Sequence, residues 1–430
     1  MKKVGEKSCM NLNLTVSLNA FVNMFREFEI HEYSFFIKHA FRVAKIVREL
    51  SKFLSLPVDS DYVYLMGLLH QIGLPLIAAT EHPEFFRQKF GKISDMEELS
   101  KTFSGGEKHP IVSKQILSSV RFLPQNLSNA IFYHRDPSKC MDLERTLSYS
   151  LMTADIVARK AAMYESLHSK FLEETVYEIK EHKEIPDTVK DAMLKILSRY
   201  SFAYLIDDQP RFFSEKELTL EEFGSLAKLL VFLLDFRSTF TRNHSILVAE
   251  VSKKIAEEIL SEEDGRLVYI AGLLHDIGKI RISPQLLHKA SRLNEQEMFV
   301  MKTHVLETYK ILSESGIAPC VTNIAAAHHE RLDGSGYPLG LTAKNLMIHQ
   351  RILQVADVFV ALIEERPYRR ALSVPEAFEI LESEIERGRL DTRIFEALKQ
   401  IINEGNLNIP ESFLIPDYIR FSSSKFSEGR

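Results

Sequence analysis

The later half of the chain carries a set of side chains that can bind metal cations. They are five histidines and two aspartates: His244, His275, Asp276, His304, His328, His329 and Asp357. Imidazole nitrogens combined with carboxylate oxygens suit first-row ions such as iron, manganese or zinc, whereas magnesium and calcium prefer oxygen ligands alone. Seven ligands exceed the usual needs of one ion, so we expect two ions. Asp276 is the natural bridging ligand, because its two oxygens can bind both ions while its neighbour His275 holds one of them.

An internal repeat places a second, incomplete copy of this set in the first half. YVYLMGLLHQIG at 62–73 and LVYIAGLLHDIG at 267–278 agree at eight of twelve positions, with an offset of 205 residues. Three further pairs keep the same order along the chain: His39 with His244, His109 with His304, and Asp155 with Asp357. A lone His-Asp pair is more often a surface or core feature than a ligand pair, but this ordered repetition favours a metal site.

The elements that position these residues are predicted to be helices. Capping signals stand at Thr219-Leu-Glu-Glu222, Asn294-Glu-Gln-Glu297 and Ser373-Val-Pro-Glu376, and Ser283-Pro284 reads as an N-cap followed by proline. Val248, Val251, Ile255 and Ile259 recur at helical spacing, and no comparable alternating strand pattern appears. We therefore predict an all-α fold with two homologous helical domains. The segment 201–217 mixes charge and proline without a helical period, so we place the domain boundary there.

Length and composition limit the class of protein. The 430 residues predict two or three domains at roughly 150 residues each. A net charge of −5 gives no reason to expect DNA or an acidic membrane as a partner. The three cysteines lie far apart, the N-terminus has no signal-peptide core, and the apolar stretches are shorter than the ~20 residues needed to span a bilayer. We expect a cytoplasmic protein without membrane insertion.

Three motifs in the second half resemble those of the HD-GYP family: HDIGK at 275–279, HHERLDGSGYP at 328–338 and RPYR at 366–369. The bacterial members of this family are HD-superfamily phosphohydrolases that cleave the messenger cyclic di-GMP. The resemblance covers roughly residues 226–402 and implies two tandem HD-type helical domains. It also implies two ligand sets: His244, His275, Asp276 and Asp357 around one ion, and His304, His328 and His329 around the other, with Asp276 shared.

The resemblance suggests a division of the chain. We expect a degenerate, non-catalytic HD-like domain at 15–200, a linker at 201–224, an HD-GYP catalytic domain at 225–405 and a C-terminal tail at 406–430.

The implied chemistry is metal-dependent hydrolysis of cyclic di-GMP to linear pGpG, with further cleavage to GMP left open. Two divalent ions, iron or manganese, about 3.5 to 4 Å apart would lower the pKa of a bridging water, and the hydroxide would attack the phosphodiester in line. By resemblance Lys279 is a catalytic lysine that neutralises phosphate charge or assists the leaving oxygen. The alternative is a helix-end cation beside Gly278.

The loop 333–338 and two arginines are the candidate substrate contacts. Gly336 permits close approach of the backbone to a ligand, and Tyr337 has a ring that can stack on guanine. Arg366 and Arg369 offer planar guanidinium groups that suit phosphate oxygens.

The chain departs from the family pattern at several positions. Phe240 stands where some members have a glutamate that recruits a third metal, Val360 stands where a second aspartate is common, and Asn243 replaces a glycine. In the first half, Gln71 replaces the bridging aspartate, a single His134 replaces the histidine pair, and no GYP loop follows. We expect that half to be catalytically inactive and to serve in sensing, dimerisation or docking. One weakly held ion there stays an open alternative.

Two other functions remain as alternatives. Val360 and the inactive half favour a non-hydrolysing receptor or scaffold that binds the cyclic dinucleotide or a GGDEF-type cyclase. An HD phosphohydrolase acting on another nucleotide is the third reading. The expected partners are thus cyclic di-GMP, GGDEF-type cyclases and a second copy of the chain in a homodimer, with no DNA.

Overall fold

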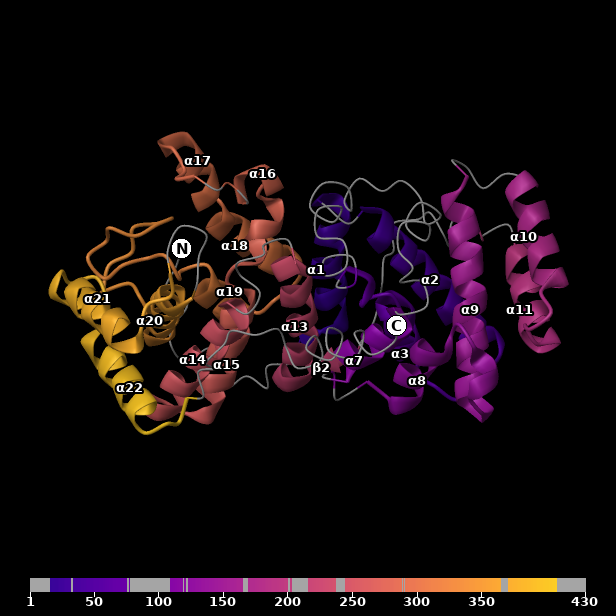
Figure 1. Ribbon diagram of the computed structural model, residues 1–430, viewed down its shortest axis with the longest axis horizontal. Helices are drawn as coiled ribbons and strands as arrows, with labels where there is room; N and C mark the ends of the chain where they lie inside the picture. The colour runs from indigo at the N-terminus through magenta and orange to yellow at the C-terminus, as the bar shows by residue number, and fades with distance from the viewer. Residues whose placement is uncertain are drawn as a thin grey trace, which may run out of the picture. The chain divides into compact units, whose positions relative to one another are not determined.

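The structure is a computed structural model, and the residues that it describes are predominantly helical (Figure 1). It describes residues 16–31, 34–75, 77, 109–118, 120, 123–164, 169–199, 202, 216–236, 244–287, 289, 291–364 and 370–407. Within these ranges the strands are β1 (Val16–Ser17) and β2 (Glu217–Leu218), which pair antiparallel. The predicted all-α fold class is confirmed. In the same ranges no helix is long and apolar enough to cross a membrane.

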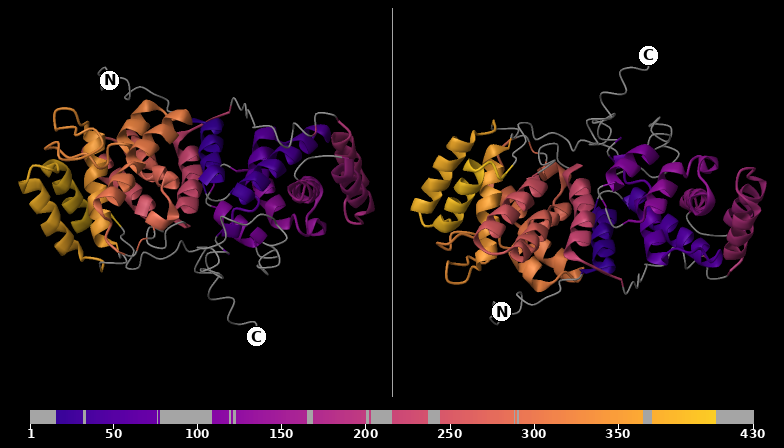
Figure 2. Two further views of the ribbon diagram at one scale, coloured as in Figure 1. Left: turned by 90° about the horizontal axis from the view of Figure 1, so that it is seen from above. Right: turned by 90° about the horizontal axis from the view of Figure 1, so that it is seen from below.

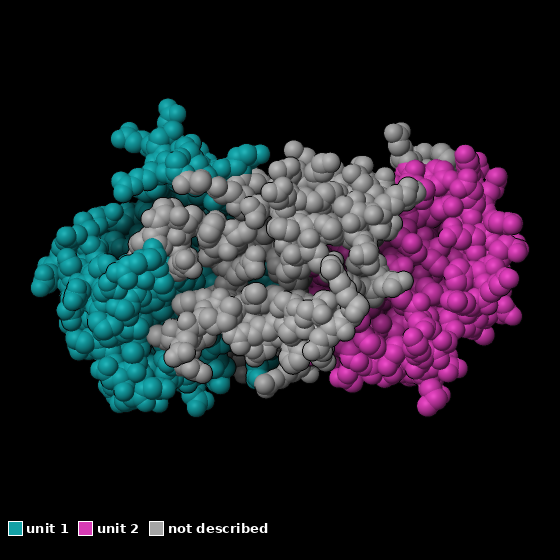
Figure 3. Space-filling model, viewed as in Figure 1, with its two compact units in different colours: residues 1–27, 215–430 teal, residues 28–214 magenta. Residues whose placement is uncertain are grey.

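The chain divides into two compact units, which Figure 3 colours separately. The C-terminal unit consists of residues 1–27 and 215–430, and the N-terminal unit consists of residues 28–214. The helix α1 (Leu18–His31) begins in the first of these and ends in the second. The expected linker at 201–224 includes β2 and the first turn of α13, so the ordered C-terminal unit starts earlier than residue 225.

The N-terminal unit is built around a long helix, α9 (Asp142–Ala162). The helices α2 (Ser34–Phe53) and α8 (Gln125–Tyr133) both pack on α9, and α2 also packs on α3 (Ser60–Leu69). The remaining elements are α7 (His109–Leu117), the short 3-10 helix η4 (Pro137–Lys139), α10 (Ser169–Glu181) and α11 (Asp187–Leu197).

The C-terminal unit repeats this arrangement with α14 (His244–Ile259) packed on α15 (Glu262–Leu274) and on α20 (Ile348–Ile363). Its other helices are α13 (Leu220–Phe236), the 3-10 helix η5 (Ile277–Arg281), α16 (Pro284–Leu287), α17 (Glu295–Lys302), α18 (His304–Glu314), α19 (Pro319–Ala325), α21 (Val374–Glu386) and α22 (Thr392–Asn403). The yellow helices α21 and α22 lie beside α20 in both views of Figure 2.

Local capping chemistry sets several helix starts, as predicted. The capping boxes at Asn294 and Ser373 are complete, and Thr219 exchanges hydrogen bonds with Glu222 in the same way. Ser283 Oγ accepts a hydrogen bond from Leu286 N at 3.4 Å at the start of α16. These side chains satisfy backbone N–H groups that have no partner inside the helix.

One ion-pair cluster ties α1 to the segment after α15. Arg281, the last residue of η5, donates to Glu27 of α1 at 3.0 Å and to Glu307 of α18 at 2.7 Å. The backbone reinforces the link, because Leu18 N donates to Lys216 O at 3.0 Å beside the paired strands. Residues 16–27 are thus part of the C-terminal unit in structure although they lie more than 180 positions earlier in sequence.

Two equivalent glycines allow the central helices to approach closely in each unit. A Cβ built at Gly272 of α15 would lie 2.8 Å from Ala249 Cα of α14, and one at Gly67 of α3 would lie 2.5 Å from Ala44 Cα of α2. Since both neighbours are backbone atoms, the helices would have to move apart to admit a side chain.

We predict that Gly272→Ala lowers the free energy of unfolding by about 1–3 kcal/mol, the usual cost of overpacking a dense core. Gly224→Ala in α13 is the matched control, because its Cβ would meet the flexible Ile270 Cδ1 at 3.0 Å and no backbone atom within 4 Å. Denaturant unfolding followed by circular dichroism measures both. Equal stability losses in the two variants would contradict the role given to close backbone approach at Gly272.

Candidate metal centre

The HDIG segment lies where α15 ends and η5 begins. His275 is the C-cap of α15, and Asp276 is the N-cap of η5 with φ −101° and ψ 6°. Thr308 of α18 fixes this corner, since its Oγ1 donates to His275 O at 2.9 Å and accepts from Gly278 N at 3.0 Å. Gly278 has no room for a Cβ, which would clash with the His304 carbonyl oxygen. The corner therefore brings the first turn of α18 against the HDIG segment.

A first ligand set lies between α14, α15 and α20. It consists of His244, His275 and Asp357, whose ligand atoms all lie within 4.8 Å of one another. His244 Nε2 is 3.1 Å from Asp357 Oδ1, and His275 Nε2 is 3.9 Å from the same oxygen. These three residues are separated by up to 113 positions in sequence, and all are buried.

A second ligand set consists of His304, His328 and His329. His304 Nε2 lies 3.3 Å from His328 Nε2, and His329 Nδ1 lies 3.8 Å from Asp357 Oδ2. His304 begins α18, whereas the histidine pair follows α19. The structure therefore brings together all seven predicted ligands, six of them buried and His329 partly exposed.

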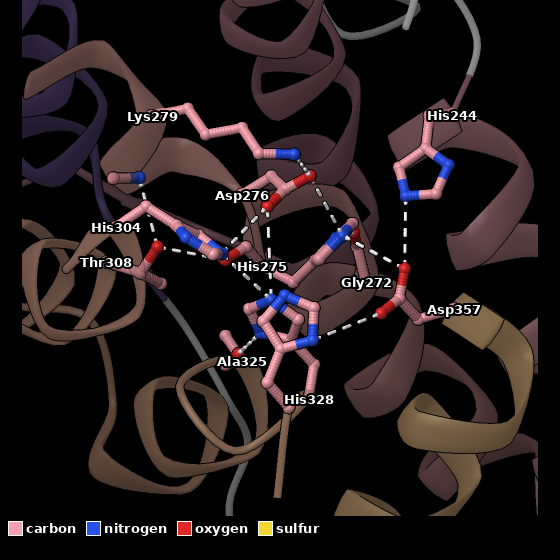
Figure 4. A network of polar contacts seen from close by, with 12 residues as sticks. His244, Gly272, His275, Asp276, Lys279, His304, Thr308, Ala325, His328 and Asp357 are labelled. Atoms are coloured by element: carbon pink, nitrogen blue, oxygen red, sulfur yellow. Dashed lines mark hydrogen bonds and ion pairs between the residues drawn. The ribbon is translucent and has the colours of Figure 1, made fainter. Parts of the chain in front are cut away.

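Asp276 lies between the two sets, as Figure 4 shows. Its Oδ2 is 3.3 Å from His275 Nε2, while its Oδ1 is 3.4 Å from His304 Nε2 and 3.9 Å from His328 Nε2. Each oxygen of one carboxylate thus faces a different group of imidazoles. That is the arrangement a bridging ligand of a two-ion site requires.

Backbone carbonyls fix the tautomers of three ligand histidines. His275, His304 and His328 each place Nδ1 at 2.7 Å from a carbonyl oxygen, of Gly272, Met301 and Ala325 respectively. A carbonyl only accepts hydrogen bonds, so Nδ1 carries the proton and the Nε2 lone pair points into the pocket. These interactions orient the rings before any ion binds.

The charges of the pocket also suit cation binding. Burial lowers the pKa of His304 to about 4 and that of His329 to about 3, so both imidazoles are neutral at pH 7. Burial opposes ionisation of Asp276, but Lys279 and His275 hold its pKa well below the usual range. His275 Nε2 is buried without a hydrogen-bond partner, which a bound cation would supply. The residues present therefore fit divalent ions.

Glu364 belongs to the pocket, although our sequence analysis did not identify it. It is the C-cap of α20, and its Oε2 lies 2.8 Å from His244 Nδ1. Burial disfavours a charge on His244, but the carboxylates of Glu364 and Asp357 raise its pKa to about 10. Glu364 follows Asp357 by seven residues, two helical turns, so it shares a helix face with a ligand. That spacing was the available signal.

Glu364 orients His244 in the way that carbonyls orient the other ligands. With the Nδ1 proton held by a carboxylate, Nε2 of His244 faces Asp357 and the pocket, where a bound cation would take the place of the Nε2 proton. The carboxylate also makes the imidazole a stronger electron donor toward a cation.

The predicted substrate contacts lie partly within the described structure. The Tyr337 ring packs on His329 with centroids 4.8 Å apart, and Lys302 Nζ lies 4.9 Å from the Tyr337 centroid. The buried Glu330 carboxylate shapes the loop by accepting from Leu339 N at 2.7 Å and Leu341 N at 2.8 Å. Lys279 donates to Asp276 at 2.5 Å.

Two further predicted contacts and two departures from the family pattern lie outside the described residues. They are Arg366, Arg369, Phe240 and Asn243. Gly336 is described and packs directly against the backbone of Glu330 and Arg331, and Val360 is fully buried in α20.

Comparison with known proteins gives the same picture for both halves. Two family models, each described as an HD domain, match residues 36–201 and 205–394. The chain is 40% identical over 187 residues to 3'3'-cGAMP-specific phosphodiesterase 1 of Vibrio cholerae, covering 43% of each chain. It is 40% identical over 169 residues to the cyclic di-GMP phosphodiesterase response regulator RpfG of Xanthomonas campestris, covering 38% of this chain and 44% of that one. The chain thus spans less than half the length of these relatives.

A solved structure also resembles the fold. It is that of a cyclic GMP-AMP specific phosphodiesterase of V. cholerae, 18% identical, with a TM-score of 0.48 over 94% of this chain and 99% of that chain.

We predict that Glu364→Ala weakens metal binding by about 10–100-fold, the usual effect of removing a group that orients a ligand histidine. Glu364→Gln should lose less, because its amide oxygen still accepts the His244 Nδ1 proton. Calorimetric titration of metal-free protein with Mn²⁺ measures both. Glu382→Ala, at an exposed position of α21, is the control. If the alanine and glutamine variants bind Mn²⁺ as the control does, Glu364 does not orient His244.

Proposed function

Because the chain belongs to the HD-GYP family, with an HD domain ahead of the HD-GYP domain, we propose that its second half is a metal-dependent phosphodiesterase of cyclic dinucleotides. The observation that carries this proposal is the position of Asp276, with one oxygen 3.3 Å from His275 and the other 3.4 Å from His304. We also propose the division of the chain expected from its sequence: a non-catalytic HD-like domain at 15–200, a linker at 201–224, the catalytic domain at 225–405 and a C-terminal tail at 406–430.

Two divalent ions, iron or manganese, are the proposed cofactors. His244, His275 and Asp357 would hold one ion, His304, His328 and His329 would hold the other, and Asp276 would bind both. Bound there, such ions supply Lewis acidity toward phosphate oxygens and lower the pKa of a coordinated water.

The remaining residues bind and orient the substrate in this proposal. Lys279, whose ammonium lies 2.5 Å from Asp276 Oδ2, can turn to a phosphate oxygen or to the leaving oxygen. Tyr337 can present its ring to a base, since the ring lies beside the ligand His329 and is held by the loop that Glu330 organises. Gly336 lets the loop pack directly against the backbone of Glu330 and Arg331. We assign Arg366 and Arg369 to binding of the substrate's phosphate oxygens.

The proposed substrate is cyclic di-GMP, cleaved to linear pGpG, with GMP as the product of a second cleavage. A second candidate is 3'3'-cGAMP, because the V. cholerae relative that is 40% identical over 187 residues is named for that substrate. Hydrolysis rates for the two nucleotides, measured side by side, decide between them. A chain that binds either nucleotide tightly with its metal present and forms no product would instead be a receptor.

We predict that Asp276→Asn and Asp276→Ala each lose both metal content and hydrolysis, with activity falling at least about 100-fold, because the two oxygens of Asp276 face His275 and His304 and are the proposed bridge between the ions. Metal analysis of anaerobically purified protein and chromatography of the products are the measurements. Glu396→Ala, at an exposed carboxylate of the same unit, is the control and should keep both. Full activity in a metal-free Asp276 variant would sink the proposal.

A further inference from the structure

The N-terminal unit keeps the geometry of the first ligand set, although it lacks the bridging aspartate. His39 Nε2 lies 3.0 Å from Asp155 Oδ1, and His70 Nε2 lies 3.8 Å from that oxygen. The equivalent distances in the C-terminal unit are 3.1 Å and 3.9 Å. The ring centroids of the two histidines are 5.5 Å apart in each unit. The N-terminal unit thus keeps the spacing of the first ligand set at all three positions.

The orientation of the His70 ring is preserved as well, whereas His39 Nδ1 is buried without the carboxylate partner that Glu364 gives to His244. His70 Nδ1 donates to Gly67 O at 2.7 Å, as His275 does to Gly272 O at 2.7 Å. In both units the Nε2 atom of this histidine is buried and has no hydrogen-bond partner. Buried polar atoms are rarely left unpaired in native structures, so an unpartnered nitrogen aimed at a carboxylate indicates a missing cation.

The second ion position has changed in a different way. Gln71 stands at the position of Asp276, so the negatively charged bridging ligand is lost. The amide nitrogen and oxygen of Gln71 are buried without hydrogen-bond partners. Arg135 follows His134 where His329 follows His328, and its Nη2 lies 3.5 Å from Asp155 Oδ2. In the C-terminal unit it is His329 Nδ1 that lies 3.8 Å from the equivalent oxygen of Asp357.

Two arginines therefore supply fixed positive charge on one side of Asp155. Arg159, one helical turn further along α9, places Nε at 3.3 Å from the same Oδ2. The other oxygen, Oδ1, faces His39 and His70. The carboxylate thus has one oxygen paired with guanidinium groups and one directed at two imidazoles.

We propose that the N-terminal unit binds one divalent cation through His39, His70 and Asp155, and that the Arg135 guanidinium takes the place of the second ion. Two nitrogens and one oxygen suit a first-row ion such as Fe²⁺, Mn²⁺, Co²⁺ or Zn²⁺. The ion would connect α2, α9 and the end of α3, and it would stabilise this unit because it binds only the folded form.

The test uses the full chain with both ion positions of its C-terminal centre disabled by His275→Ala, Asp276→Asn and His328→Ala, so that the result does not depend on the proposed enzyme activity. Metal-free protein is titrated with Co²⁺, whose visible absorption reports its ligands. We expect one Co²⁺ per chain in this background and none after adding either His70→Ala or Asp155→Asn. His182→Ala, at a half-buried histidine of the same unit outside the pocket, should keep the ion.

Two results would overturn the proposal. One is a background protein that binds no Co²⁺, and the other is binding that survives both His70→Ala and Asp155→Asn. Circular dichroism of each variant shows whether a loss of binding is a loss of fold. Asp155→Asn keeps the side-chain volume and so guards against that outcome.

The role of Arg135 is tested by gain of binding. Gln71→Asp combined with Arg135→His restores the residue types of the C-terminal pocket, so the background should then take up two Co²⁺ per chain. A stoichiometry that stays at one would show that Arg135 does not occupy the second position.

Discussion

The C-terminal pocket depends on one buried carboxylate placed at a break between two helices. Burial penalises the charge of Asp276, and only positive partners on its several sides can offset that cost. Lys279 provides one, and His275 also lowers the pKa of Asp276, but the His275 and His304 rings hold their Nδ1 protons on carbonyl oxygens and turn Nε2 lone pairs inward. Cations between the carboxylate and these lone pairs satisfy both at once. Helix α15 must end at Leu274 for this to happen, because a continuing helix would direct Asp276 away from α18.

The two pockets show how one helical scaffold can meet the same electrostatic demand by different means. In both units an aspartate in the middle of a long helix faces histidines from two other elements at nearly equal distances. In the C-terminal unit the countercharge would come from outside the chain. In the N-terminal unit the side chains of Arg135 and Arg159 supply part of this positive charge from the chain itself. Such a pocket keeps its packing while losing its second ion, which explains why the repeat is still readable from sequence.

Local features were the most predictable from sequence. The capping boxes depend on residues three positions apart, and the ligand set was found because the repeat showed its order. The pairing of β1 with β2 and the contact between Glu364 and His244 could not be found in this way, because they join distant segments through three-dimensional packing. The replacement of a histidine by Arg135 is visible in the repeat, but the direction of its guanidinium toward Asp155 is not.

The division of the chain carries a consequence for any attempt to isolate its second half. Residues 16–27, which form β1 and most of α1, belong to the C-terminal unit. The chain then forms the N-terminal unit with residues 28–214 and continues the C-terminal unit from residue 215. The first HD domain is therefore an insertion in the C-terminal unit, and the chain connects the two units at both 27–28 and 214–215. A fragment cut at the linker would leave Arg281 without Glu27 and β2 without its partner strand. An internal deletion that joins residue 27 directly to residue 215 would keep both contacts.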